Sequence, residues 1–217
     1  MAGILHPDQA ATSDSSSGAL IEFRDHCSPT FLTSLTADAG LGAFTHYAPA
    51  AADRQFAALV KAASLPHSRI LVAVCGQSVL AYLTFHLPET ESRWAALPTG
   101  QVLELGGIEV ARSARGRGLA HRLMTQAFAS PDFRTRIVYA QALTWCWDLK
   151  GTQMTKAEYR QVMLQLFSAY GFESCTTDEA NIRHDRSNLL LVRVGSDVPG
   201  ALFREFRATL IQKREEW

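Results

Sequence analysis

The sequence predicts an α/β protein in which strands and helices alternate along one domain. Hydrophobic residues make up 47% of the 217 residues, enough for a packed core. Apolar or alternating segments typical of strands are interspersed with segments of helical period. One strand runs directly into a glycine-rich turn and a helix. We therefore expect an α/β domain over residues 19–195, a mobile polar leader over 1–18 and a C-terminal helix within 196–217.

The first half of the chain predicts a sheet built around a hairpin. Two apolar runs flank Cys75-Gly76-Gln77, a turn signal between strands. Two prolines mark the segment after the second run as a loop. The expected elements are a strand Ala19–Phe23, helices near Thr30–Thr36 and Asp53–Ala63, strands Arg69–Val74 and Val79–His86, and a loop Leu87–Gly100.

The second half predicts four further strands and three helices. A helix from about Arg117 to about Ser130 has an apolar stripe at Leu119, Leu123, Ala127 and Phe128, and Gly171 is a natural end for a later helix. The remaining elements are strands Val102–Val110, Arg136–Leu143, Glu173–Thr177 and Asn188–Val194, a helix Thr155–Tyr170, and an amphipathic helix Pro199–Trp217 with Leu202, Phe206 and Leu210 on one face.

Charge and cysteine usage exclude several classes of protein. Lys and Arg number 21 and Asp and Glu also number 21, which argues against a general nucleic-acid binder. The cysteines, Cys27, Cys75, Cys146 and Cys175, are scattered without a Cys-x-x-Cys pair, so we expect neither a metal site nor a disulfide framework. Without a membrane span or signal peptide in the sequence, we expect a soluble cytoplasmic protein.

The turn Arg115-Gly116-Arg117-Gly118-Leu119-Ala120 is the most informative segment. It follows a strand and opens a helix, so it aims backbone N–H groups and the positive end of the helix dipole at one point. Glycine lets the backbone approach a phosphate closely. A plain arginine-rich surface turn is the alternative. A P-loop is excluded because no Gly-Lys-Ser/Thr follows, and a Rossmann fingerprint is also missing.

This Arg-x-x-Gly-x-Ala pattern after a strand resembles the acyl-CoA signature of the GNAT N-acetyltransferases. The resemblance implies a GNAT fold, with a central mixed, splayed sheet flanked by helices, and acetyl-CoA as co-substrate without a metal. It implies that Ile108, Glu109, Val110, Arg115, Gly116, Arg117, Gly118, Leu119 and Ala120 bind acetyl-CoA. It further implies that the strand is splayed by a bulge at Gly106-Gly107, where a backbone N–H faces the thioester carbonyl.

Glu104 is the candidate general base. Glu104 lies six residues before Val110, the last residue of the strand. In the protein-lysine branch of this superfamily, the general base occupies the position with this spacing. Lysine has a reference pKa near 10.4, so deprotonating it at pH 7 costs about 4.6 kcal/mol. A carboxylate in an apolar site can accept that proton. The alternatives are a strand-end Glu104 paired with a surface arginine, and Glu109 as the base, although its place beside the turn favours a structural role.

A second segment, Trp145-Cys146-Trp147-Asp148-Leu149-Lys150-Gly151, narrows the resemblance to the acetoin-utilisation acetyltransferases. The resemblance covers residues 19–195. Its other motifs are Leu65–Ile70, Thr84-Phe85, Arg93-Trp94 and Leu103–Val110. It implies acetylation of a lysine on acetyl-CoA synthetase, which switches that enzyme off. The candidate acceptor-binding residues are Trp145, Trp147, Asp148 and Thr176, with His184 for acceptor binding or proton handling. We expect the two tryptophans to point the same way from a strand end, unless one packs in the core.

One departure from the family pattern concerns the general acid. Many relatives place a tyrosine four residues before Gly171, where this chain has Phe167. The CoA thiolate then leaves with water as the donor, and we expect the Phe172 ring to lie in the core. Two other functions stay open at this point: acetylation of a small amine, and a catalytically silent acetyl-CoA-binding module that binds a partner.

Overall fold

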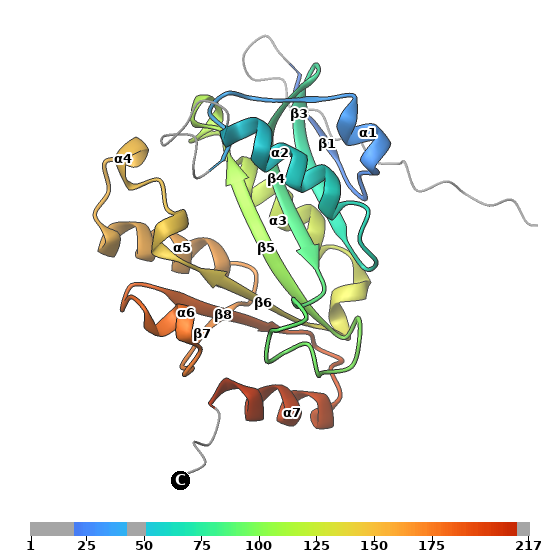
Figure 1. Cartoon of the computed structure of the whole chain (residues 1–217), viewed down its shortest axis with the longest axis vertical. Helices are drawn as coiled ribbons and strands as arrows, with labels where there is room; N and C mark the ends of the chain where they lie inside the picture. Colours follow the sequence, from blue (N-terminus) through green and yellow to red (C-terminus); the bar gives the residue numbers. More distant parts are fainter. Residues whose placement is uncertain (1–19, 43–50, 212–217) are drawn as a thin grey trace, which may run out of the picture. The chain divides into compact units, whose positions relative to one another are not determined.

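The computed structural model describes residues 20–42 and 51–211. The predicted leader, residues 1–18, lies outside the described residues, as does the end of the predicted C-terminal helix. Figure 1 traces the elements along the chain by colour. No helix in the described ranges is both long and apolar enough to cross a membrane.

Strands and helices alternate as the sequence predicts. The strands are β1 Glu22–Arg24, β2 Thr36–Ala37, β3 Arg69–Cys75, β4 Ser78–His86, β5 Val102–Val110, β6 Ile137–Ala142, β7 Glu173–Cys175 and β8 Leu189–Val194. The α-helices are α1 Pro29–Thr33, α2 Ala51–Ala62, α3 Leu119–Phe128, α4 Leu149–Thr152, α5 Lys156–Ser168, α6 Ala180–Arg183 and α7 Gly200–Leu210. Short 3₁₀ turns cover Arg112–Ala114, Pro131–Arg134 and Thr144–Cys146.

The strands form an open, mixed sheet in the order β1-β3-β4-β5-β6-β8-β7, with β2 paired to β4. β5 and β6 run parallel, as expected for strands joined through a helix, and α3 lies between them in the chain. β6 and β8 are antiparallel over six residue pairs, from Ile137↔Val194 to Ala142↔Leu189. The mixed α/β class predicted from the sequence is therefore confirmed.

The chain divides into two compact units. Unit one comprises Met1–Thr84 and Gly107–Ala127, and unit two comprises Phe85–Gly106 and Phe128–Trp217. Unit one has its own core, formed by the buried strands β3 and β4 and by Leu119, Leu123 and Met124 of α3. The domain bounds 19–195 stay a prediction.

Unit two contains a core that reaches from the sheet to α7. Trp94, from the segment predicted as a loop, is buried against the Tyr139 ring, with 4.1 Å between the ring centroids. The rest of the cluster consists of Val102, Ile137, Leu190, Val192, Leu202 and Phe206. Leu202 and Phe206 belong to α7, and Leu210 packs against the cluster half-buried. The predicted apolar face of the C-terminal helix is confirmed.

Helix boundaries differ from the sequence prediction where a backbone angle or a cap decides them. α3 begins at Leu119 rather than Arg117, because Gly118 has φ +72° and cannot belong to a right-handed helix. α5 begins after a capping box, in which Thr155 accepts from the Glu158 N–H while the Glu158 carboxylate accepts from the Thr155 N–H. Gly171, with φ +78°, follows the end of α5 as predicted.

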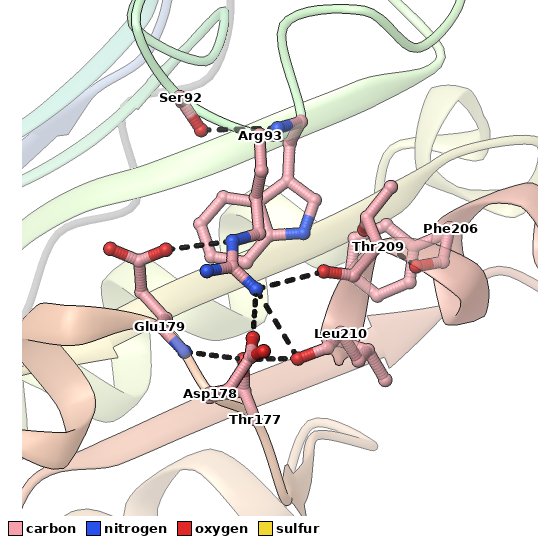
Figure 2. A network of polar contacts seen from close by, with 9 residues as sticks. Ser92, Arg93, Thr177, Asp178, Glu179, Phe206, Thr209 and Leu210 are labelled. Carbon is pink, nitrogen blue, oxygen red and sulfur yellow. Dashed lines mark hydrogen bonds and ion pairs between the residues drawn. The ribbon is translucent and has the colours of Figure 1, made fainter. Parts of the chain in front are cut away.

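β7 is shorter than the predicted strand Glu173–Thr177 because side-chain contacts draw the chain toward α7. The Thr177 hydroxyl donates to the Leu210 carbonyl at 2.6 Å, and the Asp178 N–H donates to the same carbonyl at 3.1 Å. Figure 2 shows these contacts around the Arg93 side chain. Local periodicity alone could not predict this tie between segments far apart in the sequence.

We predict that α7 contributes substantially to the stability of unit two. Phe206 is fully buried, so Phe206→Ala removes a ring from a packed core and should lower the free energy of unfolding by about 3–5 kcal/mol. Phe203, on the same helix but 36% exposed, is the matched control, and Phe203→Ala should cost under about 1 kcal/mol. Urea unfolding followed by circular dichroism measures both. Equal losses would contradict the packing described here.

Candidate functional site

Glu104 is held by a tyrosine on the neighbouring strand. In the parallel pairing of β5 and β6, Glu104 is the register partner of Tyr139. The Tyr139 hydroxyl donates a hydrogen bond of 2.8 Å to Glu104 Oε2. Because the Tyr139 ring is buried in the core of unit two, it fixes the orientation of the carboxylate. None of the described Lys or Arg residues forms an ion pair with Glu104, so the arginine-paired alternative is not what is observed.

Burial makes Glu104 a better proton acceptor than an exposed carboxylate. Desolvation raises the pKa of Glu104, and the nearby charge of Glu89 raises it further. The Tyr139 hydrogen bond and the charge of His86 act in the opposite direction. The pKa of Tyr139 is itself raised, first by burial and then by the charge of Glu104, so the phenol keeps its proton and donates. A carboxylate with a raised pKa suits general-base chemistry near neutral pH.

His86 lies on the same face of β5 as Glu104. A Cβ at Gly106 would overlap the His86 ring, so the imidazole fills the space of a side chain at position 106. Residues 104 and 106 share one face of the strand, because strand side chains alternate. His86 Nδ1 lies 2.7 Å from the Leu87 carbonyl, which can only accept, so Nδ1 carries a proton and donates it to that carbonyl. Position 106 therefore needs a glycine so that the His86 imidazole can lie close to the β5 backbone.

The turn between β5 and α3 has room for an anion. Gly116 has φ +75° and Gly118 φ +72°, and an added Cβ at either would meet no atom within 4 Å. α3 begins directly after this turn, so its first N–H groups have no partner within the helix. Arg115 Nε donates to the Val110 carbonyl at 3.4 Å, which ties the turn back to the end of β5. Arg117 is exposed.

The other residues of the predicted acetyl-CoA site lie at the edges of this turn. Ile108 and Val110 are half-buried near the end of β5, Leu119 is buried, and Ala120 is half-buried in the first turn of α3. Two free glycine positions, a helix N-terminus and a nearby arginine are the features that a pyrophosphate requires. The residues present therefore fit the co-substrate predicted from the sequence.

Glu109 has a structural partner. Its carboxylate accepts from Gln55 Nε2 at 3.1 Å, and the same amide nitrogen contacts the Tyr82 hydroxyl. These contacts tie β5 to α2 and β4 within unit one. The geometry supports the interpretation that Glu109 is structural and leaves Glu104 as the candidate base.

The two tryptophans differ in exposure, which confirms the alternative that one of them packs in the core. Their segment is a 3₁₀ turn, Thr144–Cys146, rather than a strand end, so the two-residue period does not apply. Trp147 is 6% exposed and stacks on Tyr159 of α5, with 5.0 Å between ring centroids. Trp145 is 42% exposed and meets the His184 ring edge-on at 5.8 Å. Trp147 is thus a core side chain and Trp145 a surface one.

Asp148 acts as a helix cap. It is buried, and its Oδ1 accepts from the Gly151 N–H at 2.9 Å at the start of α4. A Cβ at Gly151 would overlap this carboxylate, which accounts for the glycine in the Trp-Asp-Leu-Lys-Gly run. This contact is that of a helix cap.

The structure brings Trp145 and His184 together, whereas Thr176 lies beside a separate pocket. His184 is the exposed C-cap of α6. Thr176 follows β7 and lines a pocket with residues of α6 and β8. These residues and Glu104 belong to unit two, whereas the glycine-rich turn belongs to unit one. Only β5, which passes through both units, connects Glu104 to the turn along the chain.

The position of the missing tyrosine is part of the core. Phe167 is 1% exposed and lies edge-on to Phe172, 5.0 Å between centroids. Phe172 also contacts Phe128, in an aromatic cluster with Phe85 and Phe133. The prediction of a core Phe172 is confirmed, and no proton donor stands at position 167.

Sequence reasoning missed Tyr139 and His86. Tyr139 lies in the predicted strand Arg136–Leu143, but only the strand register places it opposite Glu104. The Gly106-Gly107 pair was the available signal for His86, since glycine in a strand interior marks a close approach. No group of three or more metal-ligating side chains occurs within the described ranges.

Comparison with known proteins identifies the family. The acetyltransferase (GNAT) family model matches residues 31–142. The chain is 34% identical over 152 residues to the acetoin utilization protein AcuA of Bacillus subtilis, covering 70% of this chain and 72% of that protein. It is 32% identical over 145 residues to AcuA of Bacillus licheniformis, covering 67% of this chain and 69% of that protein.

A solved structure extends the likeness to the whole fold. The crystal structure of an acetoin utilization protein from Exiguobacterium sibiricum superposes with a TM-score of 0.85 at 27% identity, covering 96% of this chain and 97% of that one. The fold, the glycine-rich turn and these matches agree. The chain belongs to the GNAT family of acetyltransferases and is an acetyl-CoA-dependent N-acetyltransferase related to AcuA.

Proposed function

We propose that this acetyltransferase acetylates a lysine side chain of a protein, that Glu104 is its general base, and that the acceptor is acetyl-CoA synthetase, which the modification inactivates. The observation that carries the first part is the buried Glu104 carboxylate, which Tyr139 orients and whose pKa burial raises. The choice of acceptor rests on the resemblance to the acetoin-utilisation acetyltransferases, whose named relatives match this chain.

The chemistry requires one proton to leave the acceptor before its nitrogen can attack. The lysine ammonium gives that proton to the Glu104 carboxylate, directly or through a water. The neutral amine then attacks the thioester carbonyl carbon, the new C–N bond forms, the C–S bond breaks, and the nitrogen loses its second proton to water. CoA leaves as a thiolate and takes its proton from water, in keeping with the buried Phe167 at the position of the usual tyrosine. His86, which lies on the same face of β5 as Glu104, is placed to pass the proton of Glu104 toward solvent.

For the co-substrate we propose the predicted set on β5 and the following turn: Ile108, Glu109, Val110, Arg115, Gly116, Arg117, Gly118, Leu119 and Ala120. Within this set, Gly116 and Gly118 provide the open backbone and α3 provides the helix N-terminus. Glu109 contributes through the backbone of β5, because its carboxylate is engaged with Gln55.

The acceptor surface that we propose centres on Trp145 and His184. An exposed indole face suits the apolar stem of a lysine and its ammonium before proton loss. Asp148 is engaged as a cap, so it does not supply the carboxylate that a small free cation would need. A folded protein brings surrounding contacts that a small amine lacks, which favours the protein acceptor. Trp147 supports this surface through its stacking on Tyr159.

We predict that Glu104→Gln lowers the acetylation rate by roughly 10²–10⁴ at pH 7 while leaving acetyl-CoA affinity unchanged. The amide keeps the shape of the carboxylate but cannot take a proton. The loss should shrink at alkaline pH, where more of the acceptor lysine is already neutral. Steady-state kinetics across pH measures this, and a wild-type rate at pH 7 would assign the role to another group.

The same substitution should stabilise the fold at neutral pH. Because burial raises the folded-state pKa of Glu104, the protonated form is favoured in the native protein, and stability is lost as pH rises through that pKa. Glu104→Gln removes this loss, so its melting temperature should exceed that of the wild type at pH 7–8. The difference should disappear in acid, below the unfolded pKa. An inactive variant that is also less stable at pH 7 would instead indicate a damaged fold.

We predict that Gly118→Val abolishes tight acetyl-CoA binding. The valine side chain would fill the open space beside the turn where the pyrophosphate is proposed to lie. A side chain at φ +72° also strains the backbone by about 1–2 kcal/mol, which needs a matched control. Gly76→Val provides one, because Gly76 has φ +61° and equally open surroundings in the β3–β4 hairpin. Calorimetry that finds equal acetyl-CoA affinity in the two variants would contradict the assignment.

We predict that Trp145→Ala raises the KM for acetyl-CoA synthetase by about 2- to 30-fold without changing the KM for acetyl-CoA. Phe203→Ala, an exposed aromatic residue on α7, is the control and should leave both values unchanged. Mass spectrometry should find acetyl-lysine on the synthetase. A small amine acetylated with a higher kcat/KM than the synthetase would contradict the protein acceptor.

A further inference from the structure

A pocket in unit two has three arginines among its lining residues. Its volume is about 360 Å³, and it lies where β7, α6 and the start of β8 meet, with Arg160 entering from α5. Arg183 ends α6, and Arg186 follows it in the loop before β8. Arg183 and Arg186 are exposed and Arg160 is half-buried. The pocket is thus distinct from the glycine-rich turn, which belongs to unit one.

These three guanidinium groups form no hydrogen bond or ion pair with any other described residue. The carboxylate within the pocket lining, Asp185, is bound to Lys156 and accepts from the Ser187 N–H at 2.8 Å. Its pKa is lowered to about 2, first by the Lys156 hydrogen bond, so it stays ionised and tied to that lysine.

Two carboxylates that follow the lining residue Thr177 are paired with another arginine. Arg93 pairs with Asp178 and, at 2.8 Å, with Glu179. Figure 2 shows both acidic side chains turned toward the Arg93 guanidinium, which also donates to the Thr209 carbonyl at 3.0 Å. The carboxylates of Asp178, Glu179 and Asp185 are therefore engaged by Arg93 and Lys156, whereas Arg160, Arg183 and Arg186 have no ion-pair partner among the described residues.

The floor of the pocket is apolar and its rim is polar. Leu189 and Leu190 are buried, and Cys175 and Ile182 are half-buried. Ser174 and Thr176 add hydroxyl groups at the rim. An apolar floor under guanidinium forks fits a ligand with a short carbon skeleton and planar or tetrahedral anionic groups, because arginine binds carboxylate and phosphate in bidentate fashion. The volume is that of a small-molecule site.

We propose that this pocket binds a small organic dianion, either a phosphate monoester or a dicarboxylate, through Arg160, Arg183 and Arg186. The proposal is independent of the acetyl-transfer chemistry, since it uses neither Glu104 nor the glycine-rich turn. Two of its lining residues also hold the turn that presents Trp145: Asn188 Oδ1 accepts from the Thr144 N–H at 2.8 Å, and Asp185 accepts from the Thr144 hydroxyl at 3.3 Å. The bound dianion therefore lies against side chains that position the Trp145 segment.

Isothermal titration calorimetry on the full chain tests the proposal. The protein is first saturated with CoA, so that the glycine-rich turn cannot supply a second anion site. Glycerol 3-phosphate and succinate are the organic dianions, inorganic phosphate tests for the bare anion, and glycerol is the neutral control. We expect saturable binding of at least one organic dianion, weaker binding of phosphate and none of glycerol. Absence of saturable binding by both organic dianions would overturn the proposal.

Matched variants locate the binding. Arg183→Gln should weaken the binding of the organic dianion by about 10-fold or more, since a charge-assisted hydrogen bond is worth about 1.5–3 kcal/mol. Arg204→Gln, an exposed arginine on α7 of the same unit, should leave it unchanged, and both variants should keep wild-type affinity for acetyl-CoA. Equal weakening in the two variants would overturn the proposal. So would binding of an acidic tripeptide, Asp-Glu-Asp, in place of the small dianions, since that would identify the pocket as a contact for a protein surface.

Discussion

The hydrogen bond from Tyr139 to Glu104 is the constraint on which the candidate site depends. It exists because β5 and β6 pair in a register that sets these two residues side by side. Tyr139 can hold the carboxylate only because its own ring is fixed by Trp94 and the surrounding core, which includes Phe206 of α7. A C-terminal helix remote in sequence thus supports the orientation of a single carboxylate.

Most of the carboxylates described above in unit two have a specific partner. Asp148 caps a helix, Asp185 binds Lys156, and Asp178 and Glu179 share Arg93. Glu104, in contrast, accepts a hydrogen bond from a neutral group. Burial raises the pKa of its carboxyl, and a raised pKa suits a general base. The same distribution of partners leaves the three arginines of the β7–α6–β8 pocket without an ion-pair partner among the described residues. Both proposals of function therefore rest on charged groups, Glu104 and the three pocket arginines, that have no ion-pair partner among the described residues.

Much of the architecture could be predicted from the sequence because it depends on local signals. Apolar runs identified the strands, Gly171 identified the end of α5, and the Arg/Gly turn identified the family and indicated that a helix follows it. Glu104 could be singled out by its offset from that turn. Each of these features resides in a short window of sequence, where periodicity and glycine placement act directly on the backbone.

The features that the sequence did not predict depend on contacts between distant segments. The register that brings Tyr139 to Glu104 and the approach of His86 to Gly106 involve neighbouring strands that local patterns cannot align. The different exposures of Trp145 and Trp147 follow from a 3₁₀ turn held by Asn188, 44 positions away. The early end of β7 follows from bonds to the last carbonyls of α7.

The pKa of the Glu104 carboxyl is the most direct measure of the central claim. It can be followed by carbon-detected NMR on protein labelled with ¹³C-glutamate, with Glu104→Gln used to assign the resonance. The account predicts an inflection above the ordinary value of 4.5, and a further rise in Tyr139→Phe, which removes a hydrogen bond that lowers it. An inflection at or below 4.5, or one that Tyr139→Phe does not move upward, would contradict the account.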